Sequence, residues 1–298
     1  MIADSTLNPK IRASVSLANM TSFKVGGQAE WFLDPHSPED LRAGLAWGSE
    51  RQLPLTLLGA GSNLLIGDRG LSGLVICMRH LRGIHFDDCT GQITAAAGEP
   101  VARLAWQAAA RGWSGLEWAV GIPGTVGGLV VMNAGAQGGC AAERLVEAQM
   151  MSYGGESYSL NPEDLGFSYR TSVLQGSDRI VTGATLQLTP GCDPAKITAA
   201  TDEHLKARHA TQPYHLPSCG SVFRNPYPKA AAWLIEQTGL KGFQIGNAQV
   251  AQLHANFIVN RGGATANDIS RLISHIQEQV EKKWSLLLEP EVKFIGQF

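Results

Sequence analysis

The sequence predicts an α+β fold, in which strands, short helices and glycine-rich turns mix without a regular βαβ order. Two observations support this over residues 20–190. Apolar runs of strand length lie between helices, and the glycine loop after the run Leu55–Leu58 leads into another apolar run instead of a helix. A third observation is a strongly amphipathic stretch near the C-terminus, which predicts a further helix-bearing unit beyond residue 190.

Several segments have the periodicity and end signals of helices. Ser37 followed by Pro38 is typical of an N-cap and first helical position, and Thr265 with Asp268 forms a capping box. The expected helices cover residues 38–51, 100–111, 195–209, 230–237 and 265–284. The apolar stripe of the last helix indicates packing against a core.

Apolar runs bounded by turn residues predict strands. They cover residues 53–58, 74–78, 92–97, 145–153, 156–160 and 180–188. Gly154-Gly155 separates two of these runs and predicts a hairpin turn. The composition changes near Pro190, where we expect a domain boundary.

Charge and cysteine usage restrict the class of protein. A net charge of −2 argues against a general nucleic-acid binder, and no apolar stretch approaches the ~18 residues of a membrane helix. The first twenty residues show no signal-peptide core. The five cysteines include no C-x-x-C pair, and His204, His209 and His215 fit no zinc spacing, so we expect a cytoplasmic protein without a metal site.

The run from Gly121 to Gly135 is the most informative segment. Its glycines remove side chains from an apolar stretch, and Pro123 fixes one φ angle. Such a loop is expected to leave bare amides for a phosphate or a flat ring, although a tight turn between packed strands would have the same composition.

A second glycine loop covers residues 59–65. It resembles the start of a dinucleotide fingerprint, but Leu64 stands where the third glycine belongs and no helix follows. A Rossmann site is therefore disfavoured. A strand–glycine nest–strand arrangement remains, which can bind a pyrophosphate through backbone amides.

Three polar residues lie in unusual settings. Ser221 follows a glycine and precedes a β-prone run, so its hydroxyl is expected at a strand start, unless it only caps a turn. Arg170 offers a fork suited to a carboxylate or phosphate, although a surface arginine is the commoner case. Glu291 is expected inside an apolar strand, where a carboxylate needs a partner.

Together these segments resemble the UDP-N-acetylenolpyruvoylglucosamine reductase family. The resemblance runs from Thr21-Ser22-Phe23-Lys24-Val25-Gly26-Gly27 to Glu289-Pro290-Glu291-Val292, and Gly220–Pro226 is similar to the family's catalytic serine motif. Only Thr171–Arg179 separates Arg170 from the next strand, so the chain resembles the shorter, type II form of the family.

The resemblance implies a two-part FAD-binding region of the vanillyl-alcohol-oxidase (PCMH) type plus a C-terminal α+β substrate-binding domain. The implied domains are residues 1–80 and 81–190 for the two FAD-binding subdomains, 191–286 for substrate binding, and 287–298 for a strand returning to the active site. The residues implied to bind FAD are Gly59, Ala60, Gly61, Ser62, Asn63, Leu64, Gly121, Ile122, Gly124, Thr125, Gly127, Gly128, Asn133, Ala134 and Gly135.

The resemblance also implies a reaction, the reduction of UDP-N-acetylglucosamine-enolpyruvate to UDP-N-acetylmuramate in peptidoglycan precursor synthesis. NADPH reduces FAD, and flavin N5 then delivers hydride to the vinyl carbon. Arg170 and Glu291 are implied to stabilise the enolate-like state, and Ser221 to donate the proton. Tyr169 and Asn225 are implied substrate contacts.

Two other functions remain open from the residues alone. The chain could be a different FAD oxidase or dehydrogenase of the same fold, or a flavin-free sugar-nucleotide binder in which the glycine loops only pack strands. The colour of the purified protein separates the last possibility from the others.

Overall fold

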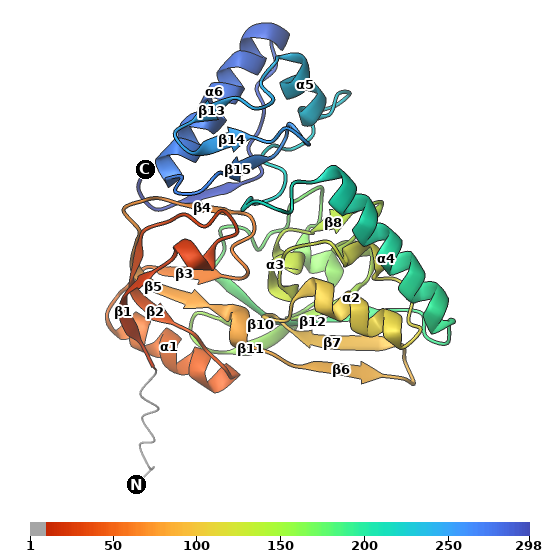
Figure 1. Ribbon diagram of the computed structural model, residues 1–298. Coiled ribbons are helices and arrows are strands. Elements are labelled where there is room, and N and C mark those ends of the chain that lie inside the picture. Colours follow the sequence, from red (N-terminus) through yellow and green to blue (C-terminus); the bar gives the residue numbers. More distant parts are fainter. Residues whose placement is uncertain (1–9) are drawn as a thin grey trace. The chain divides into compact units, whose positions relative to one another are not determined.

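The computed structural model describes residues 10–298, which form two compact units (Figure 1). The first unit holds the residues up to Ala13 together with Trp31–Ala60 and Gly73–Lys206, and the second holds Ser14–Glu30, Gly61–Ser72 and Ala207–Phe298. Each unit has its own buried apolar cluster. The chain passes from the first unit to the second within the glycine loop after residue 58.

Two sheets supply most of the strands of the first unit, and three strands of the four-stranded sheet include residues assigned to the second unit. The four-stranded sheet has the order β1-β2-β5-β3, and β3 and β5 are parallel. The five-stranded sheet has the order β11-β10-β12-β7-β6 and is antiparallel. The strands are β1 (Arg12–Ser16), β2 (Gln28–Leu33), β3 (Leu55–Leu58), β5 (Leu71–Cys77), β6 (Ile84–Asp87), β7 (Gln92–Ala96), β10 (Leu145–Ser152), β11 (Ser157–Leu160) and β12 (Arg179–Gln187). The predicted strands and hairpin are confirmed.

The helices begin where the sequence signals place them. In α1 (Pro38–Glu50) the Ser37 hydroxyl accepts a hydrogen bond from the Asp40 amide (3.1 Å), as an N-cap should. The helices α2 (Val101–Ala110) and α4 (Pro194–Thr211) are also confirmed. The glycine run contains a helix that the sequence did not predict, α3 (Val126–Val131), followed by the short pair β8 (Gly135–Ala136) and β9 (Gly139–Cys140).

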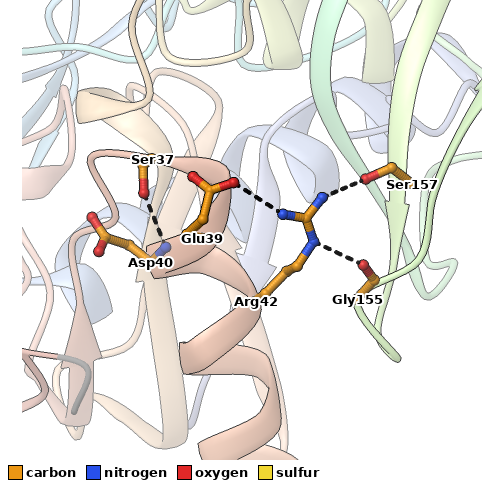
Figure 2. A network of polar contacts seen from close by, with 6 residues as sticks. All are labelled: Ser37, Glu39, Asp40, Arg42, Gly155 and Ser157. Carbon is orange, nitrogen blue, oxygen red and sulfur yellow. Dashed lines mark hydrogen bonds and ion pairs between the residues drawn. The ribbon is translucent and has the colours of Figure 1, made fainter. Parts of the chain in front are cut away.

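An arginine joins helix α1 to the β10–β11 hairpin, as Figure 2 shows. The guanidinium of Arg42 donates to the Gly155 carbonyl (3.1 Å) and the Ser157 hydroxyl (3.0 Å), and it also pairs with Glu39 (3.2 Å). The pair with Glu39 is exposed and contributes little stability. The bonds to the hairpin matter more, because they connect an element that packs on the first sheet with the edge strand of the second.

The second unit places two helices beside a small sheet (Figure 1). Helix α6 (Ala266–Trp284) begins with the predicted capping box of Thr265 and Asp268 and buries its apolar stripe. Helix α5 (Ala231–Gln237) packs beside it. The strands of this unit are β13 (Gln244–Ile245), β14 (Ala248–Val250), β15 (Ile258–Asn260) and a separate parallel pair, β4 (Leu64–Ile66) with β16 (Lys293–Ile295).

Short 3₁₀ turns complete the structure. They are η1 (Ala18–Met20), η2 (Met78–His80), η3 (Glu117–Ala119), η4 (Ala141–Glu143) and η5 (Pro162–Leu165). Within residues 10–298, no helix is both long enough and apolar enough to cross a membrane.

Candidate functional site

The first glycine loop connects β3 to β4, the predicted strand–glycine nest–strand order. Gly61 has a left-handed φ of +64°, and an added Cβ would lie 2.1 Å from the Met20 carbonyl oxygen, so only glycine fits. Arg79, which the sequence analysis missed, holds the loop's start: Nε donates to the Gly59 carbonyl (3.1 Å) and Nη2 to the Ala60 carbonyl (2.5 Å). An arginine far along the chain from the loop gave no sequence signal.

The second glycine loop differs from the sequence prediction in one respect. Its amides were expected to be bare, but those of Gly124, Val126 and Gly127 donate to protein carbonyls at 2.9 Å. The expectation was wrong for these three groups, because the loop lies against Ala97 and Glu99, whose carbonyls accept from Gly127 and Val126.

The unpartnered polar group of this loop is instead the hydroxyl of Thr125. Thr125 is the N-cap of α3, yet its side chain makes no capping bond. The residue is only 4% exposed, and its Oγ1 has no hydrogen-bond partner among the described residues. A buried hydroxyl without a partner is costly, and a ligand that accepts its hydrogen bond removes that cost.

The two glycine loops meet at this hydroxyl. A Cβ added to Gly59 would lie 2.8 Å from Thr125 Oγ1, so the glycine at position 59 allows the hydroxyl to lie this close to the backbone of the first loop. A glycine backbone beside an unused hydroxyl donor suits a phosphate oxygen. These residues of the first unit therefore fit the pyrophosphate of a dinucleotide such as FAD.

The end of the second loop is tied to the segment of Arg170. Asn133 is buried, and its side chain donates to the Ser168 carbonyl and accepts from the Ala142 amide, both at 3.0 Å. Arg170 Nη2 donates to the Gly135 carbonyl at 2.7 Å. Arg170 also lies over the ring of the exposed Tyr169. The structure thus brings together the predicted residues 133–135 and 169–170 within the first unit.

In the second unit, Ser221 begins a short extended segment between two other parts of the chain. On one side, Glu291 N donates to the Val222 carbonyl (2.8 Å). On the other side lies Asn256, and Val222 N donates to its carbonyl (2.8 Å). The expected strand at Ser221 is not formed. Among the described residues, the β pairing of this segment is the isolated bridge of Phe223 with Pro290.

The side chain of Asn256, another residue that the sequence analysis missed, fixes this segment. Its Oδ1 accepts from Phe223 N (2.9 Å) and its Nδ2 donates to Phe223 O (2.8 Å). Asn256 is 2% exposed, so both bonds are shielded from water. A lone amide within the apolar run 255–259 was the sequence signal that could have found it. The Ser221 hydroxyl, which is half-buried, makes no hydrogen bond to another described residue.

Glu291 lies beside this segment and beside the first glycine loop. It precedes β16 by two residues, so the expectation that it stands inside a strand was wrong. Asn63 Nδ2 donates to the Glu291 carbonyl (3.0 Å), and Lys293 N donates to the Asn63 carbonyl (3.0 Å), because β16 pairs with β4 in parallel. The register of that pair therefore sets the position of Glu291 beside residues 61–64.

The pKa of Cys219 is affected by its burial and by the nearby charge of Glu291. Burial raises the pKa of the Cys219 thiol well above its ordinary value, and the negative charge of Glu291 raises it further. A raised pKa disfavours the thiolate, which is the reactive form of a cysteine. Asn225 has a structural bond as well, since its Oδ1 accepts from Ala231 N at the start of α5 (3.0 Å).

The α+β fold and the paired glycine loops define an FAD-binding protein, and the comparisons agree. An FAD binding domain model matches residues 29–161, and a model of the C-terminal domain of UDP-N-acetylenolpyruvoylglucosamine reductase matches residues 212–295. Reductases of that name are 62% identical in Nostoc punctiforme (97% of this chain, 87% of the relative) and 58% identical in Acaryochloris marina (98% and 94%).

A solved structure extends the comparison to the fold. The UDP-N-acetylenolpyruvylglucosamine reductase of Thermus caldophilus superposes with a TM-score of 0.81 at 35% identity, covering 96% of this chain and 100% of that one. The chain belongs to the UDP-N-acetylenolpyruvoylglucosamine reductase family, and the predicted fold class is confirmed.

Proposed function

We propose that this protein uses NADPH to reduce the enolpyruvyl group of UDP-N-acetylglucosamine-enolpyruvate, forming UDP-N-acetylmuramate. The observation that carries the proposal is family membership over nearly the whole chain. The pairing of Gly59 with an unpartnered Thr125 hydroxyl supports the cofactor part of it, because these residues fit a pyrophosphate. FAD, when bound, supplies the hydride for the vinyl carbon.

The residues that hold FAD in this proposal are those of the two glycine loops. The first set is Gly59, Ala60, Gly61, Ser62, Asn63 and Leu64, and the second is Gly121, Ile122, Gly124, Thr125, Gly127, Gly128, Asn133, Ala134 and Gly135. The loop amides that already donate to protein carbonyls fix the conformation of the loop and do not themselves donate to the cofactor. The Thr125 hydroxyl is then the group that donates to the cofactor.

Arg170 binds and polarises the substrate in this proposal. Hydride addition to the vinyl carbon leaves negative charge on the adjacent carbon, conjugated with the substrate carboxylate. A guanidinium fork matches that carboxylate and stabilises the developing charge. The Nη2 bond to Gly135 holds the guanidinium at a fixed place. Tyr169 and Asn225 are proposed to contact other parts of the substrate.

Ser221 donates the proton that completes the reduction. A serine hydroxyl does not ionise at neutral pH, but it can protonate a strongly basic carbanion held beside it. The main-chain bonds of Val222 and Phe223 to Asn256 fix the backbone from which that hydroxyl projects. Glu291 acts with Arg170 on the enolate-like state, and so near a substrate carboxylate it is protonated or paired with a cation.

We place this activity in the cytoplasm. All five cysteines are free thiols, which agrees with a reducing compartment.

An anaerobic experiment on the wild-type protein tests the function. NADPH should bleach the flavin absorption band at about 450 nm. UDP-N-acetylglucosamine-enolpyruvate should then restore the band, with one UDP-N-acetylmuramate formed per flavin. A colourless protein that ignores added FAD would support the flavin-free sugar-nucleotide binder. A flavin that NADPH reduces but that only oxygen reoxidises would support another enzyme of the same fold.

A further inference from the structure

Three metal-ligating side chains meet on the first unit, away from both glycine loops in sequence. They are Asp34, His36 and His80, and one ligand atom of each lies within 4.8 Å of the others. Asp34 follows β2, and His80 closes η2 directly after β5. Because β2 and β5 are neighbours in the four-stranded sheet, the fold brings these residues together although they are far apart in sequence.

The three side chains lie close together. His80 Nδ1 lies 2.7 Å from Asp34 Oδ2, and the rings of His36 and His80 are stacked with centroids 4.9 Å apart. The second carboxylate oxygen, Asp34 Oδ1, is buried and has no hydrogen-bond partner among the described residues. An unsatisfied carboxylate oxygen on a residue whose other oxygen contacts an imidazole is a group that a divalent cation could satisfy.

The backbone around the cluster is fixed. Pro35 separates Asp34 from His36 and restricts the chain between them. The His36 amide donates to Asp40 Oδ2 (2.9 Å), and Asp40 in turn is bound by the Ser37 cap of α1 shown in Figure 2. The backbone position of His36 is therefore set by the start of a helix.

We propose that Asp34, His36 and His80 form a binding site for one late transition-metal cation such as Zn²⁺. Two imidazoles and one carboxylate suit this class of metal, and water would supply the fourth ligand. Ligand atoms at about 2.0–2.2 Å from a tetrahedral metal lie roughly 3.4 Å apart. The His80–Asp34 contact must therefore open slightly. The His80 side chain, which is half exposed, can turn without disturbing the core.

A bound cation would cross-link the β2–α1 connection to η2. The residue before His80 is Arg79, which holds the Gly59 and Ala60 carbonyls of the first glycine loop. The site thus lies next to the part of the chain that orders this loop, and occupancy is expected to raise the thermal stability of the first unit. This inference does not depend on the proposed reaction.

Metal titration of the tag-free, FAD-saturated protein, first freed of metal by chelation, tests the proposal. Calorimetry with ZnCl₂ should show one site per chain, and Co²⁺ should give the absorption of a tetrahedral complex. His36→Ala, His80→Ala and Asp34→Asn should each weaken Zn²⁺ binding at least about 10-fold. His85→Ala is the matched control, since His85 is an exposed histidine of the same unit outside the cluster.

Each outcome decides the proposal. Loss of the site in the three ligand variants but not in His85→Ala supports it. No stoichiometric uptake by the wild-type protein, unchanged binding in the ligand variants, or an equal loss in His85→Ala would overturn it. Flavin content and circular dichroism identify any variant that fails to fold, and because His36 and His80 are exposed, at least these two variants are expected to fold.

Discussion

At the scale of a single residue, Thr125 is the side chain that we propose to donate a hydrogen bond to the cofactor. Sequence reasoning selected it as one member of a glycine-rich run, on composition and on family resemblance. The structure adds the physical reason, a buried hydroxyl with no partner that lies close to the backbone of Gly59. Sequence could not supply this, because the contact joins residues 59 and 125 through the fold.

Replacing Thr125 by Val should separate stability from cofactor affinity. Valine keeps the shape and removes the unpaired hydroxyl, so the FAD-free protein should be as stable as wild type or more stable. FAD affinity should fall by roughly 10- to 100-fold, the value of a hydrogen bond to a charged group. Flavin fluorescence titration measures the affinity, and Thr125→Ser, which keeps the hydroxyl, is the control. Unchanged affinity in Thr125→Val would remove the hydroxyl from the cofactor site.

Arg170→Lys tests the guanidinium fork. Lysine keeps the positive charge but cannot make two parallel bonds to a carboxylate. We expect reoxidation of the reduced flavin by the enolpyruvyl substrate to slow by roughly 10- to 100-fold, with reduction by NADPH little changed. Stopped-flow absorbance separates the two rates. Wild-type turnover in this variant would exclude Arg170 from substrate binding.

His254 predicts a pH dependence of stability. Burial lowers the pKa of His254 below its ordinary value of 6.5, and its Nδ1 accepts a hydrogen bond from Asn256 N (3.3 Å). Below about pH 6.5 the unfolded chain binds the proton more readily than the folded one. The stability contributed by neutral His254 is thus complete above pH 6.5 and is lost as the pH falls through the lowered value.

A non-titrating variant isolates this effect. His254→Asn keeps an acceptor near the Asn256 amide but cannot be protonated, so its unfolding free energy should depend less on pH between about 7.5 and 5. Urea unfolding at several pH values measures the difference from wild type. Identical pH profiles for the two proteins would show that His254 stays uncoupled from folding.

At the scale of elements, sequence signals predicted five of the six α-helices of the described residues but fewer than half of the strands. The helices were predicted because caps, prolines and periodicity act locally. Ser37 and Thr265 are the N-caps of α1 and α6, and Gly154-Gly155 lies in the turn between β10 and β11. The failures have non-local causes. Helix α3 forms where glycines disfavour a helix, and its first two amides, of Val126 and Gly127, bond to Glu99 and Ala97. Residues 221–223 and 291 form single main-chain bonds to segments distant in sequence and no regular strand.

Asn256 fixes the segment that follows Ser221 through its two side-chain bonds to Phe223. Its removal should lower the free energy of unfolding and slow the reoxidation of the flavin by substrate. Asn256→Ala leaves the Phe223 amide and carbonyl unpaired in a buried place, at a cost of about 2–4 kcal/mol in unfolding free energy. Reoxidation by substrate should then slow more than flavin reduction, because only the former needs an aligned Ser221. Asn267→Ala, an exposed asparagine of α6, is the control and should change neither. Equal slowing of both half-reactions would contradict a positioning role.

At the scale of the whole molecule, the residues proposed to act in the reaction belong to two units with separate cores. Gly59, Thr125 and Arg170 belong to the first, and Gly61, Ser221 and Glu291 to the second. The sequence placed a boundary near residue 190 from composition, and the predicted limits at 80, 190 and 286 stay predictions. Residues 61–72 join the C-terminal unit because β4 pairs with β16, and the paired residues Leu64 and Lys293 are 229 positions apart in sequence. Local pattern carries no information about such a pairing.

The central claim is that the Ser221 hydroxyl supplies the proton to the reduced substrate, and stopped-flow measurement of both half-reactions in Ser221→Ala tests it most directly. Ser218→Ala, a neighbouring half-buried serine, is the control. We expect flavin reduction by NADPH to stay close to the wild-type rate in Ser221→Ala, and reoxidation by UDP-N-acetylglucosamine-enolpyruvate to slow by about 10²- to 10⁴-fold. Reoxidation at the wild-type rate, or an equal loss in both half-reactions, would contradict it.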